Sequence, residues 1–244
     1  MALSRHGLDG AELWLADQSG FALLRGSSLD VAVAPSARRA GSGRALAEAA
    51  LAEAPEDVTA WSHSDHPAAA HLAESLGFVR ARALWVMARD AGPVEVPDIA
   101  GVTIRGYRDS DADEVVRVNA AAFAHHPEQG SMDRANLAER MAEPWFEPAG
   151  LLVADSGSRL LALHWTKQHS PDLGEVYVVA VDPTAQGRGL GRAVTAAGLA
   201  HLASRGVRRI ILYVESDNEP AIATYSRLGF THTETHVQYA RSSS

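Results

Sequence analysis

The stretch Gln186–Gly191, QGRGLG, is the segment of this 244-residue chain whose residue types point most directly to chemistry. It follows an apolar, β-branched run, Glu175–Val181, which predicts a buried strand that ends at Asp182-Pro183. After the glycines, apolar residues recur at roughly helical spacing from Leu190 to His201. The glycines therefore lie between a strand and a helix N-terminus, where unpaired N–H groups attract anions and a backbone without Cβ atoms can approach a ligand closely. This setting predicts a phosphate site.

Two familiar phosphate loops do not fit this stretch. The dinucleotide fingerprint spaces its glycines as G-x-G-x-x-G, whereas this stretch spaces them as G-x-G-x-G. A P-loop requires G-K-[ST], and Lys167 is the only lysine of the chain. A tight turn in which the glycines serve packing alone remains the alternative for the loop taken by itself.

A second copy of the loop lies early in the chain. Val31–Leu46 and Val179–Val194 are identical at nine of sixteen aligned positions. Downstream, His66–Phe78 (HPAAAHLAESLGF) matches Asn218–Phe230 (NEPAIATYSRLGF), and the order of the two matches is the same in both halves. We therefore expect two homologous domains.

The predicted elements place the chain in the α/β (α+β) class, with a mixed, mostly antiparallel sheet flanked by helices in each domain. The domains are expected at residues 1–92 and 101–244, joined by the turn-forming stretch Asp90–Ala100. The second domain is expected to have strands at 102–107, 150–154 and 160–166 and helices at 111–123 and 134–141. The first domain begins almost at once with strand-like residues, so we expect it to be truncated, without the opening strand and helices.

Composition narrows the functional classes. A net charge of −8 argues against general nucleic-acid binding, which requires a basic surface. The absence of cysteine excludes disulfides, thiol nucleophiles and Cys-ligated metals. His63, His66 and His71 have no evident partner carboxylate, so surface histidines rather than a metal site are expected there. With no secretion signal and no apolar run of about 18 residues, we expect a cytoplasmic protein that does not contact membranes. We also expect a monomer.

The loop and the later motif together resemble the GCN5-related N-acetyltransferase (GNAT) family. Gln186-x-x-Gly189-x-Gly191 is similar to the coenzyme A pyrophosphate loop of that family, and Asn218–Phe230 looks like its second signature. The two stretches occur in the family's order and at a plausible separation. The resemblance implies two tandem GNAT domains that use acetyl-CoA as co-substrate, without a metal.

A narrower resemblance concerns the acceptor. The stretches HPEQG, EPWFEPAGL, HWTK, LGEVYV and LYVESDN are similar to a tandem-domain branch of the family that acetylates the cysteinyl amine of Cys-GlcN-Ins. Two alternatives stay open: a tandem GNAT enzyme that acts on another amine, such as an aminoglycoside, a polyamine or a protein N-terminus, and a non-catalytic acyl-CoA-binding protein.

Amine attack on a thioester needs a base for the amine, a donor for the carbonyl oxygen and an acid for the leaving thiolate. The resemblance implies that Glu175 is the base and Tyr225 the acid, and that a backbone N–H of the strand holds the carbonyl. As single residues, a strand-end carboxylate is more often solvated, and Tyr225 could simply pack its ring. Period-two alternation places Glu175, Tyr177, Val179 and Val181 on one face of the strand, which we expect to face a substrate cleft.

The resemblance also assigns contacts. In the C-terminal half those to acetyl-CoA are Val179, Ala180, Val181, Gln186, Gly187, Arg188, Gly189, Leu190, Gly191, Arg192 and Asn218. In the N-terminal half they are Val31, Ala32, Val33, Arg39, Ala40, Gly41, Ser42, Gly43 and Arg44. The substrate contacts are Glu128, Lys167, Glu175 and Tyr213, because carboxylates suit an ammonium or hydroxyls and a lysine suits polyol oxygens.

The N-terminal copy lacks both candidate catalytic groups. Ser27 and Ala73 stand where the C-terminal half has Glu175 and Tyr225. We therefore expect a non-catalytic first domain, which either binds CoA through its loop or only supports the other domain.

Overall fold

The computed structural model describes residues 3–124 and 130–241. The chain forms two compact units. Unit 1 runs to Trp85 and also includes the segment from Glu234 onward, whereas unit 2 is Val86–Thr233. Two long strands, β6 (Phe78–Asp90) and β12 (Thr231–Arg241), contribute residues to both units.

Unit 2 is a mixed, mostly antiparallel sheet with helices on both faces. Its sheet follows the order β11-β10-β9-β8-β7, in which only the β10–β11 pair is parallel. The strands are β7 (Thr103–Gly106), β8 (Leu151–Asp155), β9 (Leu160–Gln168), β10 (Leu173–Val181) and β11 (Arg209–Glu215). The helices are α3 (Ala112–Ala122), α4 (Arg134–Met141), α5 (Leu190–Ser204) and α6 (Glu219–Arg227). These bounds confirm the elements expected for this half.

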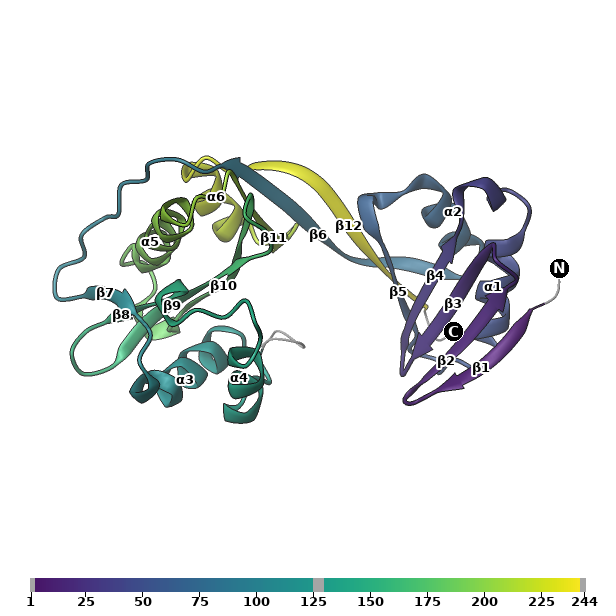
Figure 1. Cartoon of the computed structure of the whole chain (residues 1–244), viewed down its shortest axis with the longest axis horizontal. Coiled ribbons are helices and arrows are strands. Elements are labelled where there is room, and N and C mark those ends of the chain that lie inside the picture. The colour runs from purple at the N-terminus through teal and green to yellow at the C-terminus, as the bar shows by residue number, and fades with distance from the viewer. Residues whose placement is uncertain (1–2, 125–129, 242–244) are drawn as a thin grey trace. The chain divides into compact units, whose positions relative to one another are not determined.

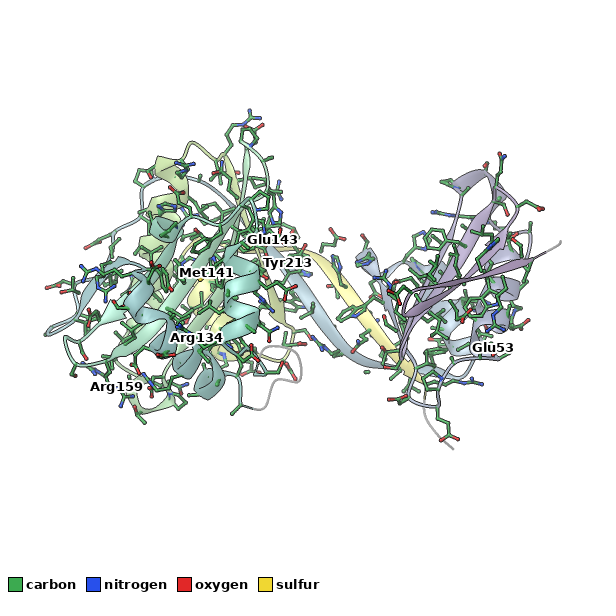
Figure 2. All side chains as sticks on the ribbon, turned by 60° about the horizontal axis from the view of Figure 1, so that its bottom comes forward. Glu53, Arg134, Met141, Glu143, Arg159 and Tyr213 are labelled. Carbon is green, nitrogen blue, oxygen red and sulfur yellow. The ribbon has the colours of Figure 1, made fainter. Side chains whose placement is uncertain are left out.

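The two faces of the unit 2 sheet have separate cores. On one face, Val115 of α3 and Leu137 of α4 pack with Trp165 and Val178. On the other face, Leu190 and Val194 of α5 pack with Ala162 and with strand residues beside it. Figure 1 shows α3 and α4 on one side of this sheet and α5 on the other. Figure 2 marks α4 by Arg134, Met141 and the following Glu143. Each helix thus buries one apolar stripe against one face, which fixes the layers.

Unit 1 repeats this plan with fewer elements. Its strands follow the order β1-β2-β3-β4-β5-β12, and only β4 and β5 pair in parallel. The strands are β1 (Ser4–Leu8), β2 (Ala11–Ala16), β3 (Gly20–Arg25), β4 (Ser28–Val33) and β5 (Thr59–Ser62), and the helices are α1 (Ser42–Leu51) and α2 (Pro67–Ser75).

The expectation that the first domain lacks an opening strand is wrong. β1 pairs antiparallel with β2, as β7 pairs with β8 in unit 2. Only Asp9 and Gly10 separate β1 from β2, so the described part of unit 1 has no helices between these strands. Both helices of the unit, α1 and α2, contribute to one core cluster with Trp14 and Phe78.

The compact units differ from the expected sequence domains at their ends. The last strand, β12, pairs antiparallel with β5, with Val237 opposite Ser62 and Tyr239 opposite Ala60. Long-range strand pairing, rather than position along the chain, therefore assigns the C-terminal residues to unit 1. The stretch 91–100, predicted to join two sequence domains, contains neither helix nor strand and lies within unit 2, because the chain passes from unit 1 to unit 2 between Trp85 and Val86. No helix in the described part of the chain is long and apolar enough to cross a membrane.

Packing between α5 and β9 requires a glycine. His164 of β9 is fully buried, and its Nδ1 lies 3.0 Å from the carbonyl oxygen of Val194. Desolvation lowers the pKa of His164 to about 4, so the ring is neutral at pH 7. A Cβ at Gly198 would lie 2.0 Å from Nδ1 of this ring. The imidazole therefore occupies the space that any other residue at position 198 would fill.

We expect Gly198→Ala to destabilise unit 2 by about 1–3 kcal/mol, because the methyl group overpacks the ring. The opposite sign, a gain of up to about 1 kcal/mol, is usual for Gly→Ala inside a helix. Urea denaturation measures the change. The double variant Gly198→Ala/His164→Ala is the control, and it should lose less stability than the two single variants added together. A single variant as stable as the wild type would contradict this account.

Candidate functional site

A β-bulge interrupts the strand that carries most of the predicted site residues. Val176 pairs with Thr166 and Val178 pairs with Trp165, so Tyr177 is the extra residue of β10. The alternation expected along this strand is therefore wrong beyond Tyr177. Tyr177 and Val178 both pack on the α3/α4 face, whereas Val179 packs on the α5 face. Val181 likewise packs on the α5 face, away from Glu175.

The bulge lies where β10 separates from β11. The parallel pairing covers only Leu173–Val176 of β10 and Arg209–Leu212 of β11. Beyond Val176, β10 continues to Val181 while pairing with β9 on its other side alone. Among the described residues, no strand pairs with the edge at Val179–Val181, so its backbone groups can bind an extended ligand.

The glycine loop begins directly after this open edge. Gly187 and Gly189 have φ values of 76° and 80°, which favour glycine, and Gly189 is the N-cap of α5. Gly191 lies close to Val181, since a Cβ there would be 3.4 Å from its Cγ2. The first helical hydrogen bond runs from the N–H of Ala193 to the carbonyl of Gly189. The N–H groups before Ala193 are therefore available at the positive end of a 15-residue helix, which suits phosphate.

Three of the predicted acceptor residues share one face of the sheet. Lys167 on β9 is the cross-strand partner of Glu175 on β10, and Glu175 pairs in turn with Ile211 on β11. Tyr213 is two residues beyond Ile211, so it lies on the same face, and it is 47% exposed (Figure 2). The fourth predicted residue, Glu128, lies outside the described residues.

Aromatic rings hold the only lysine of the chain. The Nζ of Lys167 lies 4.7 Å from the ring centroid of Trp145 and 5.3 Å from that of Tyr177. The Nη1 of Arg140 lies 3.2 Å from the hydroxyl oxygen of Tyr177, to which it donates. The cation–π contacts orient Lys167 beside Glu175. Sequence reasoning missed Trp145, Arg140 and the role of Tyr177, because none of their spacings indicates this contact.

The carboxylate of Glu175 has a histidine partner that sequence reasoning also missed. Its Oε2 lies 2.5 Å from Nε2 of His169, which follows β9 in the turn to β10. The side chain of Glu175 is only 10% exposed, and that of His169 is 35% exposed. The one sequence signal is the hairpin itself, which brings residues on either side of the 169–172 turn together.

The second motif forms a helix capped at both ends. Oδ1 of Asn218 accepts from the N–H of Ala221 at the start of α6, as expected of an N-cap. At the other end Gly229 has φ 85°, and the N–H of Phe230 donates to the carbonyl of Tyr225. The caps thus fix the helix that carries Tyr225. Burial raises the pKa of Tyr225 to about 12, so its phenol stays protonated at neutral pH.

The comparisons with known proteins agree with this geometry. A family model for the acetyltransferase (GNAT) family matches residues 12–78 and 119–230. The chain belongs to the GNAT family. It is therefore an N-acetyltransferase, and its family uses acyl-CoA as the donor. Both matched stretches include a glycine loop, so the duplication inferred from the sequence is confirmed as tandem GNAT domains.

Relatives support the same family, and solved structures share its fold. A mycothiol acetyltransferase of Nocardioides sp. is 55% identical over 97% of this chain and 88% of its own length. One from Rhodococcus jostii is 49% identical over 87% of this chain and 73% of its own. In structure, the chain is similar to a GNAT from Sphaerobacter thermophilus (TM-score 0.77, 22% identity, 95% of this chain and 80% of that chain). It is also similar to a tandem GNAT protein from the clavulanic acid biosynthesis pathway (TM-score 0.69, 21% identity, 96% and 84%). These two structures establish the fold alone.

The GNAT loop of unit 1 keeps the backbone shape of its copy. Arg39 has φ 64° and Gly41 has φ 84°, close to the angles of Gly187 and Gly189. The β3–β4 register is continuous, with Leu24 opposite Leu29, so β4 has no bulge. In the described residues, unit 1 thus repeats the glycine loop of unit 2 but not the β-bulge that precedes it in β10.

A buried carboxylate anchors the end of β10 to the loop in unit 2. The side chain of Asp182 is 3% exposed and pairs with Nη1 of Arg117 at 2.6 Å and with Arg159. Oγ1 of Thr184 donates to it at 2.6 Å. The hydrogen bond from Thr184 and the two arginines hold the pKa of Asp182 well below its usual range. Ala34 occupies the matching position in unit 1.

We expect Asp182→Asn to lower the free energy of unfolding by about 1–2 kcal/mol at neutral pH, since two partly hydrated arginines lose their shared carboxylate. Because the folded-state pKa is depressed, this stabilisation is present above the ordinary Asp pKa of about 3.9 and is lost as the pH falls below it. Urea denaturation of both proteins at several pH values measures the difference. Asp172→Asn, which removes an exposed partner of Arg208, is the matched control and should change little. A difference that grows toward low pH would contradict the assignment.

Proposed function

We propose that this GNAT enzyme transfers the acetyl group of acetyl-CoA to the cysteinyl amine of Cys-GlcN-Ins, as a mycothiol acetyltransferase. The observation that carries the proposal is the 55% identity to a mycothiol acetyltransferase over nearly the whole chain. Several further relatives at 45–51% identity bear the same name.

The donor site is proposed at the open edge of β10 and the loop that follows. Backbone groups of Val179–Val181 would pair with the extended pantetheine arm, as a strand would. The N–H groups of the loop and of the first turn of α5 would hold the pyrophosphate. Arg188 and Arg192, both exposed beside the loop, add positive charge for the CoA phosphates. A backbone N–H of the same β10 edge would stabilise the carbonyl oxygen, because preorganised donors act best where charge develops.

The acceptor site is proposed on the face that carries Lys167, Glu175 and Tyr213. Glu175 would take a proton from the acceptor ammonium. Because the pKa of an α-amino group is about 8, part of the amine is already neutral near neutral pH, and a modest base such as a carboxylate suffices. Lys167 and Arg140 place two cations on this face. Two fixed cations suit the hydroxyls of a sugar and a cyclitol, and they disfavour polyamines and aminoglycosides, which carry several positive charges.

Tyr225 is the proposed acid for the departing thiolate. Its raised pKa keeps the phenol protonated well beyond neutral pH, and a thiolate, whose conjugate acid has a pKa of about 8.5, takes a proton only from a donor in the neutral form. Asn218 supports this role through the N-cap of α6, which positions Tyr225.

Unit 1 is proposed to be non-catalytic. The residue aligned with Glu175 is Ser27, which lies in the turn before β4, and Ala73 replaces Tyr225. Its β4 and β5 also separate early, since they pair only at Ser28 and Leu29. The open edge at Val31–Val33 and the loop that follows it keep a backbone able to bind CoA without acetyl transfer.

The test of the proposed function is CoA release from acetyl-CoA with a panel of amines. We expect Cys-GlcN-Ins to give a kcat/KM at least about 100-fold above that of a polyamine, an aminoglycoside and a peptide N-terminus, which corresponds to about 2.7 kcal/mol of transition-state discrimination. Efficient turnover of another amine without turnover of Cys-GlcN-Ins would overturn the acceptor. Acetyl-CoA binding without any turnover would favour the non-catalytic alternative.

We expect Tyr225→Phe to lower the rate of the chemical step about 100-fold while acetyl-CoA affinity changes little, since only the proton donor is lost. Single-turnover kinetics measure this step without interference from product release. Tyr239→Phe is the matched control, because the hydroxyl of Tyr239 is buried in unit 1 and has no hydrogen-bond partner among the described residues. An unchanged single-turnover rate for the Tyr225 variant would remove Tyr225 from catalysis.

A further inference from the structure

Glu175 is nearly sealed from water, and this creates a requirement that the proposed reaction does not meet by itself. A carboxylate that takes a proton from an ammonium must release it before the next turnover. With 10% of its side chain exposed, Glu175 has little direct contact with solvent. An adjacent group that can accept and pass on a proton would provide the exit.

His169 is in that place. Its Nε2 lies 2.5 Å from Oε2 of Glu175, within the range of a short, charge-assisted hydrogen bond. Imidazole is the one side chain that ordinarily exchanges protons near neutral pH, and it has a second nitrogen for passing a proton on. The ring is more than three times as exposed as the carboxylate it contacts.

His169 also borders a water-accessible pocket. A cavity of about 570 Å³ is lined in part by His169, Gln168 and Ser170 from the β9–β10 turn. Glu147 lines it from the segment before β8, His201 from α5, and Arg205 from the C-cap of α5. Glu147 lies 3.6 Å from His201 and 3.5 Å from Arg205, so this wall is polar and charged. Such a pocket holds water readily, and water there can accept a proton.

We propose that His169 is a positioning residue that carries the proton of Glu175 into this pocket. In the resting state, Nε2–H of His169 donates to the carboxylate of Glu175. After the amine ammonium gives its proton to Glu175, proton exchange with pocket water moves the imidazole proton from Nε2 to Nδ1, and the freed Nε2 accepts the carboxyl proton. The imidazolium then releases its Nδ1 proton to pocket water, which restores the Nε2–H tautomer. One proton leaves per turnover, which balances acetylation that starts from the ammonium, while the second amine proton balances the one that the thiolate takes.

This inference rests on the proposed role of Glu175, and a merely structural role of His169 is its alternative. In both cases the hydrogen bond would orient the carboxylate. Only the relay requires a group at position 169 that can bind and release a proton. His169→Gln distinguishes them, because a glutamine amide can replace Nε2–H as a donor to Glu175 but cannot carry a proton.

The experiment compares His169→Gln, His169→Ala and the control His201→Gln, a second pocket histidine that contacts Glu147 instead. With an amine that the wild type acetylates, we expect both His169 variants to lose about 10- to 100-fold in kcat with KM little changed, and the control to stay within about twofold. Imidazole added to His169→Ala should restore much of the lost rate. A glutamine variant that keeps the wild-type rate, or an alanine variant that imidazole does not restore, would overturn the relay.

A readout without turnover separates this proposal from the proposed function. In the wild-type protein, NMR of ¹⁵N-labelled histidine should give a strongly deshielded Nε2 proton for His169, and Glu175→Gln should abolish it. Failure of every amine to react would refute the proposed function and leave this signal intact. Absence of the signal in an enzyme that turns over normally would overturn the relay alone.

Discussion

The separation of β10 from β11 is the constraint on which the rest of unit 2 depends. One extra residue, Tyr177, ends the regular register and leaves β10 with a single strand partner from Val179 to Val181. The bulge therefore provides an unpaired backbone edge for an extended ligand. Tyr177 also contacts Trp145 and Lys167, so the same irregularity shapes both the proposed donor edge and the proposed acceptor face.

The structure around this point holds the two sides of the bulge in place. Asp182, with its two arginines and Thr184, fixes the end of β10 and the entry to the glycine loop. Gly198 lets α5 lie against His164, which sets the helix whose N-terminus follows the glycine loop. Both interactions are buried or partly buried, so solvent weakens them little compared with a surface ion pair.

The two units share the backbone shape of the glycine loop but differ in the strand that precedes it. Both loops, Gln186–Gly191 and its copy Arg38–Gly43, have positive φ at their second and fourth residues, although Arg39 replaces glycine in one of them. Unit 1 has no bulge in β4, and its β3–β4 hairpin closes where unit 2 carries Glu175. The shape of the loop thus depends on local backbone angles and is kept in both copies, whereas the proposed acetyl-transfer site depends on a register shift and on side chains at its two ends.

The sequence by itself determined the elements of unit 2, the duplicated loop, the caps at Asn218 and Gly229, and the family. These are local properties, since helix periodicity, turn glycines and capping residues act over a few positions. The face of each residue beyond Tyr177, the contact of His169 with Glu175, the rings around Lys167 and the pairing of β12 with β5 came only from the tertiary structure. A single inserted residue inverts the two-residue alternation of a strand, and contacts between distant segments depend on register and packing that no local pattern encodes.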